Sequence, residues 1–335
     1  MTLTTASVDR QQARDILDQT SITTSLPYTA EDWPIAAAML QFPATQPDGR
    51  STRAAGPDAW RAAFEEISAY GFRAAEIPSA WLPLGEMTPQ ELDELSAVLR
   101  DTHVQPVATS VVRKNIIDPE AGDENLAASH RAIDAAAAIG SPHVSLGMHE
   151  NLTSAQIDST WFWTVEGKSN PADWESRAKA VKLMQELGDH AASVGVELSL
   201  ETYEGTYLGS ADAAVEFITD IDRVNVGINP DLGNLIRAQE PIEAWEAMTV
   251  KLLPYANYWH VKNYSRAENP AAGTYFSVPS SLASGLINYR KAVRYAIAHG
   301  FKGAFLCENY GGDGLAVTAE HQRYLRDVLR TTQHA

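Results

Sequence analysis

The stretch VELSLETYEGTYLGSADAAVEFITDIDRVNVGINPDLGN, residues 196–234, shows most clearly how the chain is organised. It opens with a short apolar segment at 196–201, continues with a helical pattern at 210–220 and returns to an apolar segment at 223–228. Short, mostly apolar segments of this kind are typical of strands buried on both faces of a parallel sheet. The stretch therefore predicts one parallel β-α-β unit.

The same alternation extends in both directions along the chain. Helix signals support it, because Thr88 and Glu91 have the spacing of a capping box and Gly300 follows the end of another helical pattern. The predicted strands are 34–42, 73–77, 104–110, 143–147, 196–201, 223–228, 256–261 and 303–308. The predicted helices are 57–70, 88–102, 122–139, 172–194, 210–220, 240–253, 288–299 and 316–331.

Eight strands and eight helices in strict alternation close naturally into a (β/α)8 barrel, or TIM barrel, a fold of about 250 residues. We predict a single α/β catalytic domain of this kind over residues 33–335, with long loops at 148–173 and 262–287. A doubly wound open sheet is the alternative fold, but the first strand–helix turn carries no GxGxxG motif. Residues 1–32 form a polar N-terminal extension, either disordered or docked on a neighbouring subunit.

Composition limits the kinds of protein that the chain can be. Of its 335 residues, 44% are hydrophobic and 21% are charged, as in soluble globular proteins. The formal net charge of −17 argues against a nucleic-acid binder, which needs a basic surface. We expect no membrane segment and no secretory signal. Because Cys307 is the single cysteine, we expect the reducing cytoplasm.

Residues with metal-binding side chains stand at the ends of the last four predicted strands, namely Glu201, Asp231, His260 and Glu308. The C-terminal ends of barrel strands meet at one mouth, where the active sites of TIM barrels lie. Each residue alone is more often a helix cap or a hydrogen-bonded side chain, but the four together predict a metal site. Their donors suit one divalent ion, Mn²⁺ ahead of Mg²⁺ or Co²⁺. We expect Lys262 to point away from His260.

The motifs ETYEG, GINPDLGN, WHVKN and CENYGG, which carry these four residues, resemble those of the xylose-isomerase-like TIM barrels. This superfamily includes ketose 3-epimerases, hydroxypyruvate isomerase and many sugar phosphate isomerase/epimerase proteins. The resemblance covers residues 34–331 and implies that the four residues bind one divalent metal ion. It also implies that Arg266 touches substrate or metal. Asn234 stands where the epimerases usually carry a histidine, and we include it among the substrate-binding candidates.

The segments HVKNYSR, GLINY and CENYGGDGL resemble more narrowly the barrel subunit of bacterial C-glycoside deglycosidases. Those enzymes cleave the carbon–carbon bond between a 3-oxo sugar and a plant polyphenol, and they work with a small β-rich partner subunit. The resemblance implies the same lyase chemistry, in which a base removes the C2 proton and the aglycone leaves from C1. His149 is the candidate base, and a solvated loop residue is the alternative interpretation. We expect an oligomer.

Aromatic residues in the two long loops, Trp161, Trp163 and Tyr275, are candidates for stacking on a flat aglycone, although burial of the loops is the simpler explanation. The second candidate activity is a sugar isomerase or ketose 3-epimerase, in which Glu201 and Glu308 pass a proton across an enediolate. An apurinic endonuclease would need three zinc ions, further histidine ligands and a basic face. A barrel that only binds sugar would not need the four metal-binding residues.

Overall fold

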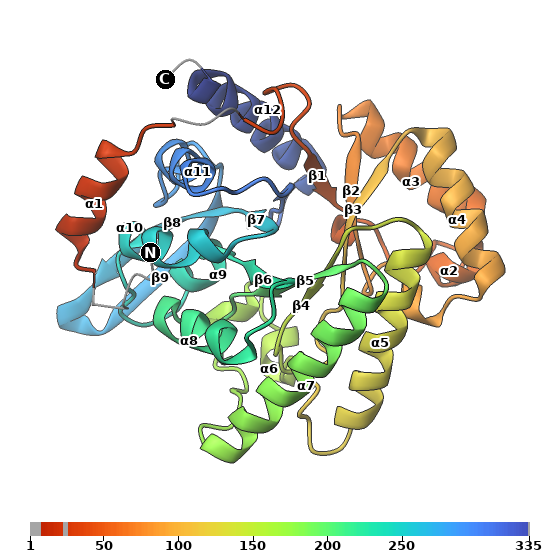
Figure 1. Cartoon of the computed structure of the whole chain (residues 1–335), viewed down its shortest axis with the longest axis horizontal. Helices are drawn as coiled ribbons and strands as arrows, with labels where there is room; N and C mark the ends of the chain where they lie inside the picture. Colours follow the sequence, from red (N-terminus) through yellow and green to blue (C-terminus); the bar gives the residue numbers. More distant parts are fainter. Residues whose placement is uncertain (1–7, 23–25, 334–335) are drawn as a thin grey trace.

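The computed structural model describes residues 8–22 and 26–333 and shows the predicted (β/α)8 barrel (Figure 1). Its strands are β1 (Ile35–Ala38), β2 (Ala74–Pro78), β3 (Gln105–Ser110), β4 (His143–Leu146), β5 (Glu197–Glu201), β6 (Val226–Asn229), β7 (Trp259–Val261) and β10 (Phe305–Cys307). All eight are parallel, in the order β6-β5-β4-β3-β2-β1-β10-β7. A parallel bridge between Ile228 and Ala256 joins the two ends of this sheet, so the barrel is nearly closed.

Helices surround the strands, and local sequence signals explain where they begin. Thr88 caps one helix in a capping box with Glu91, and Pro57 is the first residue of another. The helices that match the predicted ones are α3 (Pro57–Ala69), α4 (Pro89–Thr102), α5 (Gly122–Ala138), α7 (Trp174–Ser193), α8 (Ala211–Ile221), α10 (Trp245–Leu252), α11 (Tyr289–Ala298) and α12 (Gly314–Gln333). Shorter helices are α2 (Thr52–Ala55), α6 (Ser154–Ile157) and α9 (Leu232–Ile236).

Two elements differ from the prediction. The first strand was predicted too long, because β1 ends at Ala38 and the next three residues form a 3-10 turn. The long loop after β7 is not irregular but contains an antiparallel hairpin, β8 (Asn263–Asn269) and β9 (Thr274–Ser280). The hairpin is mostly polar and half-exposed, so it lacks the apolar run that marks the barrel strands.

The described part of the N-terminal extension packs on the barrel of the same chain. It forms helix α1 (Arg10–Gln19), which lies against α10 and α11 (Figure 1). Ala13 and Leu17 are buried at this contact, and Arg14 Nε lies 2.7 Å from Glu246 Oε1. This helix is ordered on its own barrel and is not a disordered segment, and docking on a neighbouring subunit stays a prediction. Within residues 8–22 and 26–333, no helix is long and apolar enough to cross a membrane.

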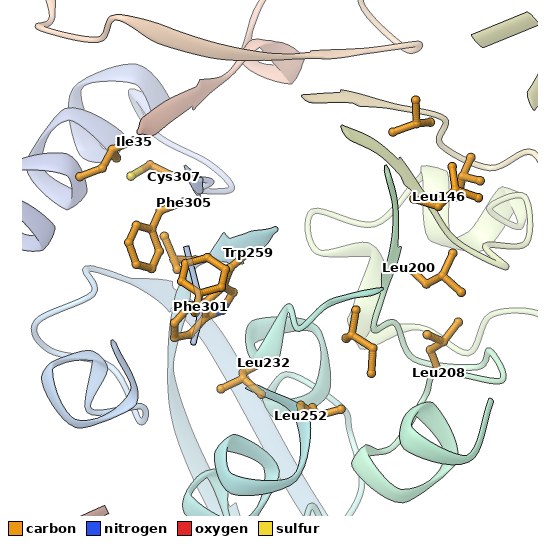
Figure 2. Close-up of a cluster of buried hydrophobic side chains, with 14 of the residues drawn as sticks. Ile35, Leu146, Leu200, Leu208, Leu232, Leu252, Trp259, Phe301, Phe305 and Cys307 are labelled. Carbon is orange, nitrogen blue, oxygen red and sulfur yellow. The ribbon is translucent and has the colours of Figure 1, made fainter. Parts of the chain in front are cut away.

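Buried apolar side chains form two clusters, and polar residues occupy the barrel mouth. The larger cluster lies mainly between the strands and the helices. Figure 2 shows Trp259, Phe301 and Phe305 together in it, with the rings of Trp259 and Phe305 5.5 Å apart. The smaller cluster includes Tyr258 and Leu306. Because side chains alternate along a strand, residues two positions further share a face with these two, and those residues build the site described next.

Candidate metal centre

The structure brings the four predicted metal-binding residues together at the C-terminal mouth of the barrel. One ligand atom from each lies within 4.8 Å of the others. Glu201 ends β5, Asp231 is the N-cap of α9, His260 lies in β7 and Glu308 directly follows β10. None of the four is more than 9% exposed. Three carboxylates this close in a buried site repel one another, so positive charge beside them stabilises the group.

His260 is oriented by a carboxylate that sequence reasoning missed. Its Nε2 lies 2.8 Å from Glu76 Oε2, and Glu76 also accepts hydrogen bonds from Ser110 and Tyr258. The other ring nitrogen, Nδ1, faces the carboxylates of Glu201 and Glu308 at 3.6 and 3.5 Å. A histidine held on one nitrogen by a carboxylate and aimed at a metal with the other is a common arrangement. The donor set therefore fits a divalent ion.

Asn234 contacts a candidate metal ligand. Its Nδ2 donates to Glu201 Oε1 at 2.9 Å and to the Thr202 carbonyl at 3.0 Å. Its backbone N–H donates to Asp231 Oδ1, which makes Asp231 the cap of α9. Asn234 is fully buried, and its Oδ1 has no hydrogen-bond partner within the described part of the chain. The residue thus positions Glu201, and its contact with a substrate stays a prediction.

Lys262 points into the centre, so the expectation that it points away from His260 is wrong. Its Nζ lies 2.7 Å from Asp231 Oδ2 and 2.9 Å from Glu308 Oε2. The error has a simple cause, because residues two positions apart in a strand lie on the same face. Burial alone would lower the pKa of Lys262, but the carboxylates of Asp231 and Glu308 raise it well above its usual value.

The crowded carboxylates also shift the pKa values of Asp231 and His260. Burial, reinforced by the nearby carboxylates of Glu308 and Glu201, raises the pKa of Asp231 to about 7, although Lys262 lowers it. Burial would also lower the pKa of His260, but the carboxylates of Glu76 and Glu201 raise it well above its usual value. Metal binding therefore competes with protons at His260.

His149 lies beside this centre. Its Nε2 is 3.6 Å from Glu201 Oε2, and its ring packs edge-on against Tyr203 with centroids 4.4 Å apart. The side chain is buried, and neither ring nitrogen has a hydrogen-bond partner among the residues that the structure describes. Burial lowers the pKa of His149 to about 4. The ring is therefore neutral near pH 7, with its protonated form disfavoured by burial.

Four aromatic side chains, which we call the aromatic wall, lie near the centre: Trp161, Phe162, Trp163 and Tyr310. Trp161 and Trp163 stack with centroids 4.9 Å apart, and Phe162 packs edge-on against Tyr310. The wall also surrounds Arg237, whose guanidinium lies 4.8 Å from the Phe162 ring centroid. Cation–π contacts of this kind are strongest when the cation is shielded from water.

Arg237 is a second residue that sequence reasoning missed. It is fully buried, and its Nε and Nη2 each lie 3.0 Å from an oxygen of Glu204. Burial alone would lower the pKa of Arg237, but Glu204 raises it well above its usual value. Glu204, Tyr203 and Trp163 also line a cavity of about 340 Å³.

Arg266 and Tyr275 belong to the hairpin. Arg266 donates to the carbonyls of Ile236, Ala238 and Glu240, and its guanidinium lies 5.3 Å from the Tyr275 ring centroid. These bonds tie β8 to the segment after α9. They give Arg266 a structural role in the hairpin, and its expected contact with metal or substrate stays a prediction.

The fold and this ligand group define a TIM barrel whose mouth could hold a divalent metal ion. A family model described as xylose isomerase-like TIM barrel matches residues 64–328, and the chain belongs to this family. The fold and the superfamily predicted from the sequence are therefore confirmed. A xylose isomerase-like TIM barrel protein from Mycobacterium smegmatis, solved in complex with magnesium, is 42% identical with a TM-score of 0.87. That match covers 91% of this chain and 99% of the other.

Two epimerases share the fold at lower identity. D-allulose 3-epimerase from Methylomonas sp. is 13% identical, with a TM-score of 0.61 over 91% of this chain and 100% of the other. The 3-keto-D-glucoside 4-epimerase from E. coli is 15% identical, with a TM-score of 0.61 over 88% and 100%. A search of curated proteins gave no significant match. Family membership supports the expectation that the chain is an enzyme.

Proposed function

We propose that the chain is a divalent-metal-dependent carbohydrate enzyme, specifically a lyase that cleaves the carbon–carbon bond of 3-oxo C-glycosides. The observation that carries this proposal is the position of His149. A buried, neutral imidazole, whose two nitrogens have no hydrogen-bond partner within residues 8–22 and 26–333, lies 3.6 Å from a carboxylate of the candidate metal centre. Such a ring can take a proton from a carbon next to a ketone.

The metal ion would be held by Glu201, Asp231, His260 and Glu308. We propose Mn²⁺, with Mg²⁺ or Co²⁺ as alternatives, because the donors are three carboxylates and one imidazole. When bound, the ion would act as a Lewis acid on the ketone oxygen of the substrate.

His149 and Lys262 then have separate roles in the proposed reaction. His149 Nε2 accepts the C2 proton, the C2–H electron pair forms the C1=C2 double bond, and the bond from C1 to the aglycone breaks. The leaving carbon takes up a proton, and the His149 imidazolium is the group that we propose supplies it. Lys262 holds a positive charge beside Asp231 and Glu308, where negative charge on the substrate would develop. The burial of all these groups excludes water and strengthens these interactions.

The aromatic wall would contact the aglycone. Trp163 and Tyr203 line the cavity of about 340 Å³, and Tyr203 also packs on His149. A flat polyphenol in this cavity would stack on these rings, with its sugar directed inward.

We also propose that the chain works as an oligomer with a small β-rich partner subunit in the cytoplasm. The resemblance of HVKNYSR and CENYGGDGL to C-glycoside deglycosidases supports the partner, and the single buried cysteine suits a reducing compartment. Co-expression with a co-encoded small protein, followed by light scattering, tests the assembly. A chain that elutes alone and as a monomer would contradict it.

The second candidate is a sugar isomerase or 3-epimerase. One observation favours it: Glu201 and Glu308 both lie close to His260 Nδ1, at 3.6 and 3.5 Å. Two carboxylates placed in this way could remove and return a proton on opposite faces of a sugar carbon.

A product assay separates the two activities. The protein, with Mn²⁺ and the partner subunit, is mixed with a 3-oxo C-glucoside and the products are followed by mass spectrometry. The lyase releases the free polyphenol, and Glu201→Gln should abolish the release while the exposed control His103→Gln retains it. Solvent deuterium entering a ketose, with no polyphenol released, would instead favour the epimerase.

A further inference from the structure

Two helices on the outside of the barrel carry another group of metal-binding side chains. α5 and α7 pack side by side (Figure 1). His130 and Asp134 lie four residues apart on α5, and Glu186 and His190 lie four residues apart on α7. Because residues four apart share one face of a helix, each helix presents an imidazole and a carboxylate to the other.

These four side chains pair across the helix interface. His130 Nε2 lies 3.1 Å from Glu186 Oε1, and His190 Nε2 lies 2.8 Å from Asp134 Oδ1. The two remaining ring nitrogens, Nδ1 of His130 and Nδ1 of His190, face each other at 2.7 Å. An ionised carboxylate only accepts hydrogen bonds, so both Nε2 atoms carry a proton.

Because each Nε2 is paired with a carboxylate, the two rings turn their Nδ1 atoms towards each other. A neutral imidazole has one ring proton, so both Nδ1 atoms present lone pairs to each other. Two lone pairs at 2.7 Å repel unless a cation lies between them. A carboxylate on the far nitrogen is also the usual partner of a metal-binding histidine. We propose that His130 and His190 form a second metal site, for a divalent transition-metal ion of the Ni²⁺, Cu²⁺ or Zn²⁺ class.

The site needs only a small adjustment to hold an ion. Metal–nitrogen bonds of about 2.0–2.1 Å at a tetrahedral angle hold two nitrogens about 3.3 Å apart, so the rings must separate by about 0.6 Å. The His130 and His190 side chains are 27% and 23% exposed, so they can move and water can complete the coordination. Asp134 and Glu186 supply negative charge around the ion.

The place of the site indicates its role. His190 lies in the last turn of α7, close to the start of β5 and away from the barrel mouth. The N-terminal face of a TIM barrel serves stability and not catalysis. The ion would therefore join α5 to α7 and stabilise the fold, and it would leave the reaction at the mouth unchanged.

Ion counting on the full chain tests this proposal. The protein is dialysed against Ni²⁺ and the bound ion is measured by mass spectrometry for wild type, His130→Gln, His190→Gln and the control His103→Gln. We expect both paired variants to bind one ion fewer per chain than wild type, and the control to match wild type. Asp231→Asn, which alters the barrel centre, should keep the outer ion. Asp134→Asn should lower its affinity by about 10-fold to 100-fold.

Spectroscopy identifies the ligands. With Cu²⁺ as probe, electron paramagnetic resonance should show coupling to two imidazole nitrogens, and His130→Gln should remove it. Melting curves confirm that each variant folds. Equal Ni²⁺ binding by wild type and both paired variants would overturn the proposal, because a shared proton alone would then bridge the rings.

Discussion

Replacing Lys262 by methionine should destabilise the metal-free protein strongly and the metal-loaded protein weakly. In the structure the buried ammonium of Lys262 lies 2.7 Å from Asp231 and 2.9 Å from Glu308. Removing one partner of a buried ion pair costs about 3–5 kcal/mol, because the other charge is left uncompensated. A bound divalent ion supplies that charge, so the loss should fall to about 1 kcal/mol, the size of an ordinary hydrogen bond. Metal should therefore stabilise the variant about 2–4 kcal/mol more than wild type.

The assay is urea unfolding, followed by tryptophan fluorescence, in EDTA and in saturating Mg²⁺. Lys291→Met is the matched control, since Lys291 pairs with Asp18 at the surface and should cost less than about 1 kcal/mol in both buffers. An equal loss for Lys262→Met in EDTA and in Mg²⁺ would refute the reasoning. So would a loss in EDTA no larger than that of the control.

Three further predictions follow from the same contacts. Glu76→Gln should lower metal affinity by about 10-fold to 100-fold in calorimetry, because His260 loses the carboxylate that orients it; unchanged affinity would show that the pairing is irrelevant to the metal. His149→Gln should reduce turnover by about 10²-fold to 10⁴-fold while metal content stays the same, and normal turnover would remove His149 as the base. Burial lowers the pKa of His321 to about 4, below its unfolded value of about 6.5. The neutral, buried His321 therefore contributes to the free energy of unfolding above pH 6.5, and this contribution is lost as the pH falls towards 4. That contribution is about 3 kcal/mol, and His321→Leu should flatten the acid side of the stability profile measured by urea unfolding; an unchanged profile would contradict it.

The barrel and the four candidate ligands could be predicted from the sequence because each depends on local pattern. Short apolar strands alternate with helices, and a polar residue at the end of an apolar strand marks the mouth. The hairpin of β8 and β9 could not be predicted in this way. Its strands pair with each other and are half-exposed, so their side chains do not form a buried run.

The errors at the site have a different origin. Glu76 stands inside an apolar strand, RAAEI, and its partner His260 is 184 residues away, so only the closed barrel brings them together. The inward direction of Lys262 could have been predicted, since it shares strand parity with His260. The role of Arg266 was assigned by resemblance alone and stays a prediction, while its three carbonyl partners become visible only once the hairpin is folded.

The arrangement of centre, wall and cavity bears on the choice between the two proposed activities. Tyr203 connects the ligand group with the cavity, because it lines the cavity and packs on His149, which lies beside the group. A substrate that uses both places needs a sugar at one end and a flat group at the other, as a C-glycoside has. The fully buried Arg237, held by Glu204 and by four aromatic rings, keeps this wall rigid. A simple sugar has no flat group to stack on this wall, and for this reason we rank the lyase first.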